Sequence, residues 1–335
     1  MGKYVLGIDG GGTKTHAALF DTDGRFVDLV RWGGTNHEYL DGGYNEMRQE
    51  LCALTNTLLR KNRISMEDIQ RSVLGLAGID TKYHHVRIES ILKDIGYKDY
   101  ILCNDAFLGV KAGCRGGFGV CSINGTGYAV AAIDQNGNTI QIGGSFELTA
   151  DNGSAYLLGK KAVAKVYESL FLNETDTCMA DILFEILSIN SKYDMMDELV
   201  SRIENKTLEL KDLAVVVFKA AENKDKTALN ILREMGEDNA KAIHAAIHET
   251  NLRDLDEIEV VLAGSVFLKA SHQEGLERLK EKLCEMNRAK KISFIKLEKM
   301  PVLGAVRWGL ESALNQAFYD KIINEFNNYK GLYNN

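Results

Sequence analysis

The amino-acid sequence predicts an α/β protein built from two related halves. Ten short strand-like tracts alternate in many places with helical tracts, and this alternation is typical of α/β folds. Of the 31 glycines, 25 precede residue 160, so tight turns are expected mainly in that part and the remainder is mostly helical. A strand that ends in a glycine-rich turn occurs twice, which indicates that one structural unit is duplicated.

Each expected strand is a short apolar or β-branched run bounded by Gly, Asp, Asn or Ser. In chain order the strands are Tyr4–Ile8, Thr15–Phe20, Phe26–Arg31, Ser72–Leu76, Tyr100–Cys103, Gly119–Ile123, Tyr128–Ile133, Thr139–Ile142, Glu259–Leu262 and Ile292–Ile295. Apolar residues spaced three and four apart predict helices over Ser154–Leu172 and Thr227–Thr250, and a further helical stretch over Ala106–Ala112.

Composition narrows the class of protein. The chain has 335 residues, of which 45% are hydrophobic, and this is enough for a large core and about two domains. Its 40 basic and 47 acidic residues give a net charge of −7, which argues against a nucleic-acid-binding protein. No apolar run approaches the ~18–20 residues of a membrane span. No signal-peptide pattern precedes the first strand, so a cytoplasmic protein with no membrane partner is expected.

The six cysteines form no CxxC pair, and we interpret them as reduced thiols of a cytoplasmic protein. A zinc site is not expected from them. His244 and His248 have helical i, i+4 spacing, but no HExxH-type base accompanies them, which disfavours a metal site there.

The duplicated unit is a β-hairpin followed by a third strand. In the first copy, Asp21 and Gly24 belong to the turn that follows the second strand, and Asp134 and Gly137 stand at the corresponding place, both 113 residues further along the chain. Two such units imply two similar lobes with a cleft between them, a common location for a ligand.

The two glycine turns are candidate phosphate-binding elements. The first is Gly10-Gly11-Gly12-Thr13, and the second is Asn124-Gly125-Thr126-Gly127. Backbone amides that point into a concavity bind anions, so two facing turns could hold one polyphosphate; the alternative is a pair of ordinary tight hairpins. Neither GxxxxGK[ST] nor GxGxxG is present, which disfavours a Walker-type or dinucleotide-binding site.

Polar residues at the strand ends are further candidates, each with a structural alternative. Asp9 could hold Mg²⁺ or stabilise the turn, and Asp105 could be a general base or a helix N-cap. Asp151, in Asp151-Asn152-Gly153-Ser154, could hold substrate or cap the helix that follows. Asn36-His37 could bind sugar hydroxyls. Ala263-Gly264-Ser265 could pack against a nucleotide or form a plain strand-to-helix turn.

The ordered set of these motifs resembles the BadF/BadG/BcrA/BcrD ATPase family, and more narrowly its N-acetylglucosamine kinase branch. No single motif is specific, whereas the order is, from Tyr4 to about Leu314: Asp9-Gly10-Gly11-Gly12-Thr13-Lys14-Thr15, Asn36-His37, Asn104-Asp105-Ala106, Gly125-Thr126-Gly127, Asp151-Asn152-Gly153-Ser154-Ala155-Tyr156, Ala263-Gly264-Ser265 and Gly304-Ala305. The resemblance implies a duplicated actin-like ATPase (ribonuclease H-like) fold with ATP between two lobes. We expect an N-terminal lobe over residues 1–115. A C-terminal lobe with helical additions is expected over 116–335, and its last helix is able to return to the first lobe.

The resemblance also implies roles for individual residues. It implies Asp105 as the catalytic base, and Asp9 as the Mg²⁺ residue, acting through water. The residues implied for ATP are Gly11, Gly12, Thr13, Lys14, Gly125, Thr126, Gly127, Gly264 and Ser265. Those implied for the sugar are Asn36, His37, Asp105, Gly144, Ser145 and Asp151. A homodimer is an expectation from the resemblance alone.

The sequence departs from the family pattern at two places. The second turn begins with Asn124 and is followed by Tyr128, where Ser or Thr first and Ser last would be usual. In the substrate loop, Ser145 and Phe146 replace Trp-Gly or Cys-Gly, and Ala150 and Asn152 replace Gly and Glu. The changes in the substrate loop bear on which sugar is recognised and do not touch the phosphate-binding turns.

The expected activity is ATP-dependent and Mg²⁺-dependent phosphorylation of an amino sugar, most directly N-acetylglucosamine or a related N-acetylhexosamine, with glucosamine and N-acetylmuramic acid also open. One alternative is the ATPase activator of a 2-hydroxyacyl-CoA dehydratase, for which Cys114 and Cys121 are the nearest cluster ligands in sequence. The other is a non-catalytic sugar or ATP sensor, which generally needs a DNA-binding extension before the first strand.

Overall fold

The computed structural model describes residues 3–146, 148–149, 151–174, 176–310 and 315–329, and within them it contains two five-stranded mixed sheets. The first sheet has the order β3-β2-β1-β4-β5, formed by β1 (Tyr4–Gly10), β2 (Thr15–Asp21), β3 (Phe26–Trp32), β4 (Ile69–Leu76) and β5 (Tyr100–Cys103). The second has the order β10-β9-β6-β7-β8, formed by β6 (Gly119–Asn124), β7 (Tyr128–Ile133), β8 (Thr139–Gly143), β9 (Glu257–Ala263) and β10 (Lys291–Lys296). The α/β fold and all ten predicted strands are confirmed.

The two sheets repeat one topology. In each, an antiparallel meander of three strands continues into two parallel strands, with β1 and β6 at the junction. The predicted duplication extends to the turns. The Oδ1 atoms of Asp21 and Asp134 each accept two backbone N–H groups, and Gly24 and Gly137 have φ of 80° and 83°. Glycine recurs there because this left-handed backbone disfavours a side chain.

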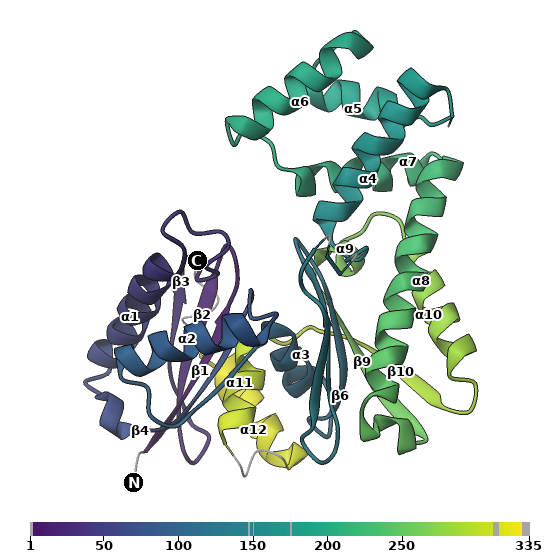
Figure 1. The fold of residues 1–335 in the computed structure, drawn as a ribbon. Helices are drawn as coiled ribbons and strands as arrows, with labels where there is room; N and C mark the ends of the chain where they lie inside the picture. Colours follow the sequence, from purple (N-terminus) through teal and green to yellow (C-terminus); the bar gives the residue numbers. More distant parts are fainter. Residues whose placement is uncertain (1–2, 147, 150, 175, 311–314, 330–335) are drawn as a thin grey trace.

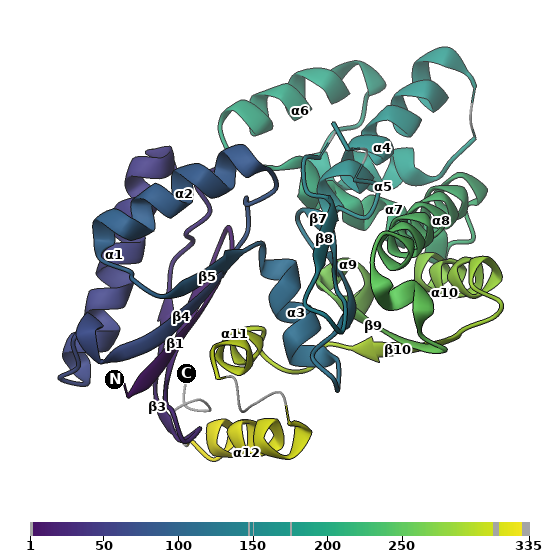
Figure 2. The same cartoon turned by 60° about the horizontal axis from the view of Figure 1, so that its bottom comes forward.

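Helices cover both faces of the first sheet (Figures 1 and 2). One face packs against α1 (Gly43–Lys61) and α2 (Lys82–Ile95), because strand residues such as Leu6 and Ile8 point toward it. Neighbouring residues such as Val5 point to the opposite face, as expected for strands. That face packs against α11 (Val302–Gly309) and α12 (Gln316–Asn327), so residues beyond 300 lie against the N-terminal sheet. The boundary near residue 115 stays a prediction.

The second sheet has α3 (Asp105–Gly113) on one face and a larger group of helices on the other. The long helix α8 (Lys226–His248) crosses that other face and packs beside α10 (Glu274–Met286). Four helices gather beyond one end of the sheet (Figure 1): α4 (Ala155–Tyr167), α5 (Met179–Leu187), α6 (Met195–Glu204) and α7 (Ala214–Glu222). A π-helical turn at Glu168–Leu172 completes the helical tract predicted after Ser154, and the short α9 (Ser265–Leu268) follows β9.

The helices α3 and α11 pack against each other between the two sheets (Figure 2). Arg307 of α11 is fully buried, and its guanidinium donates hydrogen bonds to the carbonyl oxygens of Lys111, Cys114 and Arg115 at 2.9, 2.7 and 2.5 Å. It also stacks over the Tyr319 ring at 4.2 Å. Because these carbonyls lie at the negative end of α3, a cation is favoured there, and Arg307 ties the junction of the two lobes together.

None of the helices in the described part of the chain has the length and apolarity that crossing a bilayer requires.

Candidate active site

A cleft with about 860 Å³ of open space lies between the two lobes, and both glycine turns line it. The first lobe contributes residues from the ends of β1, β4 and β5 and from the segment after β3, and the second contributes the β6–β7 turn and the loop after β8. Its lining residues are Gly11, Gly12, Thr13, Asn36, Glu38, Tyr39, Ala77, Gly78, Asp80, Asn104, Asp105, Ile123, Gly125, Thr126, Gly127, Tyr128, Ala129, Gly144, Phe146 and Lys211.

The first turn joins β1 to β2 and packs against the segment after β3. The Gly11 N–H donates to the Lys14 carbonyl at 3.0 Å, and the Gly11 carbonyl accepts from the Thr35 N–H at 3.0 Å. A Cβ atom at Gly34 would lie 2.1 Å from the Gly12 carbonyl oxygen, so only glycine permits this approach. Thr13 lines the cleft, whereas Lys14 is exposed and lies outside its lining.

The second turn is held by a buried amide. Asn124 accepts a hydrogen bond from the Ser122 hydroxyl at 2.8 Å and donates to the Gly153 carbonyl at 3.2 Å and to Asn239 of α8 at 2.8 Å. The Gly125 carbonyl in turn accepts the N–H of Ala155, at the start of α4, at 2.8 Å. The unusual asparagine at 124 therefore connects the turn with two other parts of the second lobe.

Gly264 and Ser265 lie behind the second turn and not among the cleft-lining residues. Gly264 has φ of 89°, and a Cβ atom there would lie 2.2 Å from the Asn124 carbonyl oxygen. Ser265 is exposed and begins α9. Gly264 thus permits β9 and α9 to approach the base of the turn.

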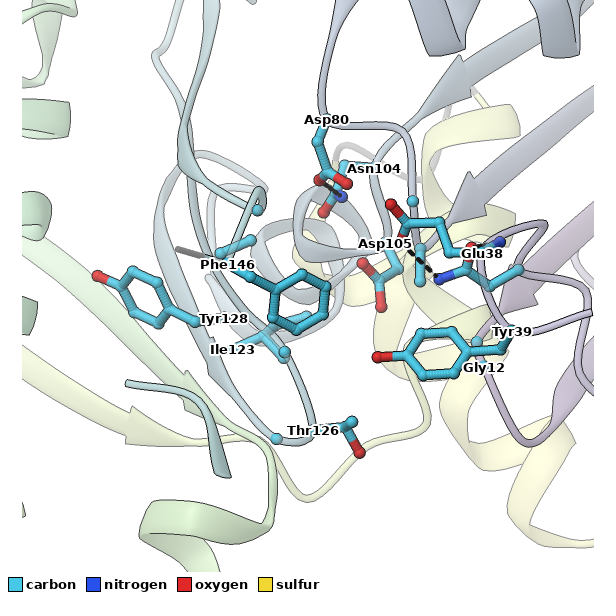
Figure 3. Close-up of a pocket in the computed structure, with 18 of the residues that line it drawn as sticks. Gly12, Glu38, Tyr39, Asp80, Asn104, Asp105, Ile123, Thr126, Tyr128 and Phe146 are labelled. Carbon is cyan, nitrogen blue, oxygen red and sulfur yellow. Dashed lines mark hydrogen bonds between the residues drawn. The ribbon is translucent and has the colours of Figure 1, made fainter. Parts of the chain in front are cut away.

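Asp105 is the first residue of α3 and points into the cleft between Phe146 and Tyr39 (Figure 3). The preceding residue, Asn104, is the N-cap, and its Oδ1 accepts the N–H of Ala106 at 2.9 Å. Burial, followed by the nearby carboxylates of Asp9 and Asp80, raises the pKa of Asp105 to about 7. A carboxyl group with a pKa near neutrality at a cleft wall is suited to accept a proton.

Asn36 lines the cleft, but the adjacent His37 does not. The Asn36 amide bonds with Glu38, whose backbone N–H donates to Asn36 Oδ1 at 3.0 Å. The His37 ring stacks on Tyr44 of α1 with centroids 4.1 Å apart. Burial, with His84 and Arg87 nearby, lowers the pKa of His37 to about 4, so the ring is neutral at physiological pH. Its position indicates a supporting contact behind Asn36.

Asp151 lies beneath the loop after β8 and is only 1% exposed. Its carboxylate accepts the N–H groups of Gly144 and Phe146 at 3.1 and 2.6 Å and the Thr149 hydroxyl at 2.7 Å. Asp151 therefore shapes the loop, while Gly144 and Phe146 line the cleft and Ser145 lines its outer mouth.

Two further departures from the family pattern are the residues on either side of Asp151. Asn152 donates to Asp238 of α8 at 2.5 Å, so an uncharged side chain faces a carboxylate there. Ala150 lies outside the described residues.

Among the cleft residues that the sequence analysis does not mention, four have polar or charged side chains: Glu38, Tyr39, Asp80 and Lys211. A signal exists for Asp80, because Ala77-Gly78-Ile79-Asp80 follows β4 and the carboxyl ends of parallel strands share one edge of a sheet. Lys211 gives no such signal, since it belongs to a short 3₁₀ helix between α6 and α7, far along the chain.

Asp9 ends β1 beside the first turn and supplies the oxygen chemistry that Mg²⁺ prefers. Its Oδ2 atom lies 3.9 Å from His16 Nδ1, and its carboxylate has no hydrogen bond to any other described residue. No group of three or more His, Cys, Asp or Glu residues in the described part of the chain is placed to hold a metal. The single carboxylate of Asp9 fits a Mg²⁺ ion that is bound mainly by phosphate and water, with one or two carboxylates.

Comparisons with known proteins agree on one family. The model of the BadF/BadG/BcrA/BcrD ATPase family matches residues 6–309. The N-acetylmuramic acid/N-acetylglucosamine kinase of Clostridium acetobutylicum is 26% identical over 265 residues, which is 79% of this chain and 85% of that protein. The N-acetyl-D-glucosamine kinase of Dictyostelium discoideum is 23% identical over 275 residues, which is 79% of this chain and 86% of that protein.

Solved structures show the same fold. A candidate N-acetylglucosamine kinase from Chromobacterium violaceum has a TM-score of 0.66 at 21% identity, over 92% of this chain and 99% of that one. The hexokinase of Schistosoma mansoni, complexed with glucose, has a TM-score of 0.54 at 12% identity, over 94% of this chain and 85% of that one. The chain therefore belongs to the BadF/BadG/BcrA/BcrD ATPase family and has the two-lobed fold of actin-like sugar kinases.

Proposed function

We propose that this protein is an ATP-dependent sugar kinase that transfers the γ-phosphoryl group of ATP to a hydroxyl group of an N-acetylhexosamine, with N-acetylglucosamine as the first candidate. The observation that carries this proposal is the shared cleft, in which two glycine turns face Asp105 from opposite lobes. The kinase names of both curated relatives support it.

The phosphate chain of ATP would lie between the turns at Gly11–Thr13 and Gly125–Gly127. Each turn offers backbone amides and a threonine hydroxyl to anionic oxygens without a bulky side chain in the way. Mg²⁺, when bound near Asp9, would neutralise charge on the phosphates. The adenosine is expected toward Gly264 and Ser265, behind the second turn. Mg²⁺ dependence, a homodimer and a cytoplasmic location belong to this proposal.

Asp105 would act on the sugar hydroxyl. Phosphoryl transfer depends mostly on positioning and on charge stabilisation, so the base is needed only to accept the hydroxyl proton as the new bond forms. A positioned base contributes about 10²–10⁴-fold to such reactions. The raised pKa of Asp105, about 7, makes its carboxylate a better proton acceptor than an exposed aspartate, while leaving it largely ionised above neutrality.

The sugar would lie between Asn36 and Asp105 on one side and Gly144 and Phe146 on the other. Figure 3 shows Asp105 and Phe146 on the two sides of this space. Closure of the lobes would exclude water from the transferred phosphoryl group, which suppresses hydrolysis of ATP when no sugar is bound.

The alternative of an iron–sulfur activator finds no support in the structure. Cys114 and Cys121 are 1% and 0% exposed and lie in the core between α3 and the second sheet. A cluster shared by two subunits would need cysteines at a surface.

The decisive experiment measures sugar-dependent ADP release with N-acetylglucosamine, glucosamine, N-acetylmuramic acid, N-acetylmannosamine and glucose, and identifies the phosphorylated product by mass spectrometry. Asp105→Asn should lower the rate about 10²–10⁴-fold. The matched control is Asp94→Asn, which changes an exposed carboxylate on the outer helix α2 and should leave the rate unchanged. Equal ADP release with and without every sugar would contradict the proposal and favour a sensor or an ATPase.

A further inference from the structure

Asp80 occupies a junction where the two lobes meet inside the cleft. It follows β4 through a turn in which Gly78 has φ of 83° and packs against Asn36. The Asp80 backbone N–H donates to His84 Nδ1 at 3.3 Å, which orients the residue at the start of α2. The side chain lies beside Asn104 (Figure 3) and also contacts Gln141 of the second lobe.

One carboxylate oxygen of Asp80 joins the two lobes. Its Oδ1 accepts hydrogen bonds from Asn104 Nδ2 at 3.0 Å and from Gln141 Nε2 at 2.7 Å. Asn104 follows β5 in the first lobe, and Gln141 belongs to β8 in the second. A Cβ atom at Gly144 would lie 2.3 Å from this oxygen, so the loop after β8 approaches Asp80 at a distance that only glycine permits.

Asn104 extends this connection to the candidate base. The Nδ2 atom of Asn104 is held by Asp80, while its Oδ1 caps α3 by accepting the Ala106 N–H at 2.9 Å. Asp105 lies in the chain between Asn104 and Ala106, and hydrogen bonds hold both of these neighbours. A chain of hydrogen bonds therefore runs from Gln141 through Asp80 and Asn104 to the N-terminus of the helix that carries Asp105.

The second oxygen of Asp80 has no hydrogen-bond partner in the part of the chain that the structure describes, and the residue lines the cleft. Burial and the nearby carboxylates of Glu38 and Asp151 raise the pKa of Asp80 to about 7, while its bonds to Gln141 and Asn104 favour the ionised form. Asp80 is part-buried and lines the cleft, so a ligand that supplies an O–H or N–H group at this point would gain a charge-assisted hydrogen bond.

We propose that Asp80 is a positioning residue for the sugar: Oδ1 holds Asn104 and Gln141 in register across the two lobes, and Oδ2 accepts a hydrogen bond from a sugar hydroxyl or amide. This inference rests on the proposed kinase function. It means that Asp80 couples sugar binding to the relative position of the two lobes.

Asp80→Asn tests the inference sharply. The asparagine keeps one carbonyl oxygen, which is able to accept from Asn104 and Gln141, but its amide group turns the second position from an acceptor into a donor. A hydrogen bond to a charged group that is lost in this way weakens binding about 10- to 100-fold. We therefore expect the Kd and KM for the sugar to rise by that factor in Asp80→Asn, with kcat reduced less than about fivefold. Asp105→Asn should show the opposite pattern, with a large fall in kcat and little change in the sugar Kd.

The contact between the lobes is tested by Gln141→Leu and by a variant that combines Gln141→Leu with Asp80→Ala. Asp94→Asn is again the exposed control. Gln141→Leu removes the donor from the second lobe and should weaken sugar binding without changing the phosphate-binding turns. In a double-mutant cycle with Asp80→Ala, the two losses in sugar affinity should be less than additive because the two residues share one hydrogen bond.

Sugar affinity is measured by calorimetry without ATP, beside the kinetic assay. Wild-type sugar affinity in Asp80→Asn, or full additivity in the cycle, would overturn the inference while leaving the kinase proposal intact. A fall in kcat with an unchanged sugar KM would also overturn it, because that pattern would make Asp80 an acid or base. If the wild type bound and phosphorylated none of the sugars, the proposed function would fail first.

Discussion

Asn124 and Asn239 are joined by a hydrogen bond of 2.8 Å between their side-chain amides, and both residues are buried, at 0% and 1% exposure. Asn239 is itself oriented by donating to the Met235 carbonyl at 2.7 Å. The bond fixes the second glycine turn to α8. It also gives a physical reason for asparagine at 124, where the resembling family usually has Ser or Thr.

Asn239→Ala should lower the free energy of unfolding by about 1–3 kcal/mol, because it leaves the Asn124 amide partly unsatisfied in the core. Since Asn124 precedes Gly125 and Thr126, the KM for ATP should rise more than the KM for the sugar. Urea unfolding and steady-state kinetics measure the two effects. A loss of stability with no change in the KM for ATP would show that the turn does not depend on this anchor.

Activity should fall on the acidic side of neutrality. A base must be ionised to accept a proton, and the pKa of Asp105 is about 7, raised first by burial and then by Asp9 and Asp80. We expect kcat/KM to fall about tenfold for each pH unit well below that pKa. The pKa of Asp80 is also about 7, so the fall in kcat/KM at acidic pH reflects the titration of both carboxyl groups together. A pH profile that stays flat between pH 5 and 7 would speak against Asp105 as the base.

Asp105→Asn should stabilise the fold at neutral and alkaline pH. A carboxyl group whose pKa is raised from 3.8 to about 7 on folding binds its proton more tightly in the folded state. The stability of the wild type therefore declines as pH rises through that window, and the full penalty is present above it. We expect a higher Tm for Asp105→Asn above pH 7 and equal values near pH 4. A variant less stable than the wild type at pH 8 would contradict the raised pKa.

Arg307→Met should destabilise the junction between the lobes. The variant removes the donor that satisfies three carbonyl groups at the end of α3, so a loss of at least about 1–3 kcal/mol, the cost of one buried unsatisfied polar group, is expected in urea unfolding. Arg288→Met is the matched control, because Arg288 is exposed, and it should change stability by less than about 0.5 kcal/mol. Similar midpoints for the two variants would show that the Arg307 bonds contribute little.

Gly264→Ala should displace the second glycine turn, because Gly264 packs against Asn124 at its base. The added methyl group would lie 2.2 Å from the Asn124 carbonyl oxygen, and φ of 89° is unfavourable for alanine. We expect lower stability and a raised KM for ATP. The control is Gly33→Ala, where a Cβ atom would meet no atom within 4 Å. Equal effects of the two substitutions would argue against close packing at Gly264.

Local patterns are sufficient to predict every strand and the two glycine turns. The period-two alternation of a strand and the need for glycine at a left-handed turn depend on near neighbours, and so Asp21-to-Gly24 and Asp134-to-Gly137 can be matched from the order of residues alone. The same reasoning puts Asp105 at the end of β5, where parallel strands present their carboxyl ends.

The orientation of single side chains cannot be predicted in this way. The sequence groups His37 with Asn36 because the two are adjacent, yet the His37 ring packs on Tyr44 while Asn36 lines the cleft. It also groups Asp151 with the sugar-binding residues, yet the Asp151 carboxylate bonds to the backbone of its own loop. Neighbouring residues often point to opposite sides of the chain, and their surroundings come from distant segments.

The sequence by itself determined the ten strands and the duplicated hairpin unit, because these follow from short-range periodicity and backbone geometry, whereas the role of Asp105 as candidate base is implied by the family resemblance. Only the tertiary structure decided that Asp80 meets Gln141 across the cleft, that Asn124 bonds to Asn239, and that α11 and α12 return to the N-terminal sheet. Those contacts join residues about 60 to 300 positions apart, and they form because packing buries apolar faces and leaves each buried polar group in need of a partner.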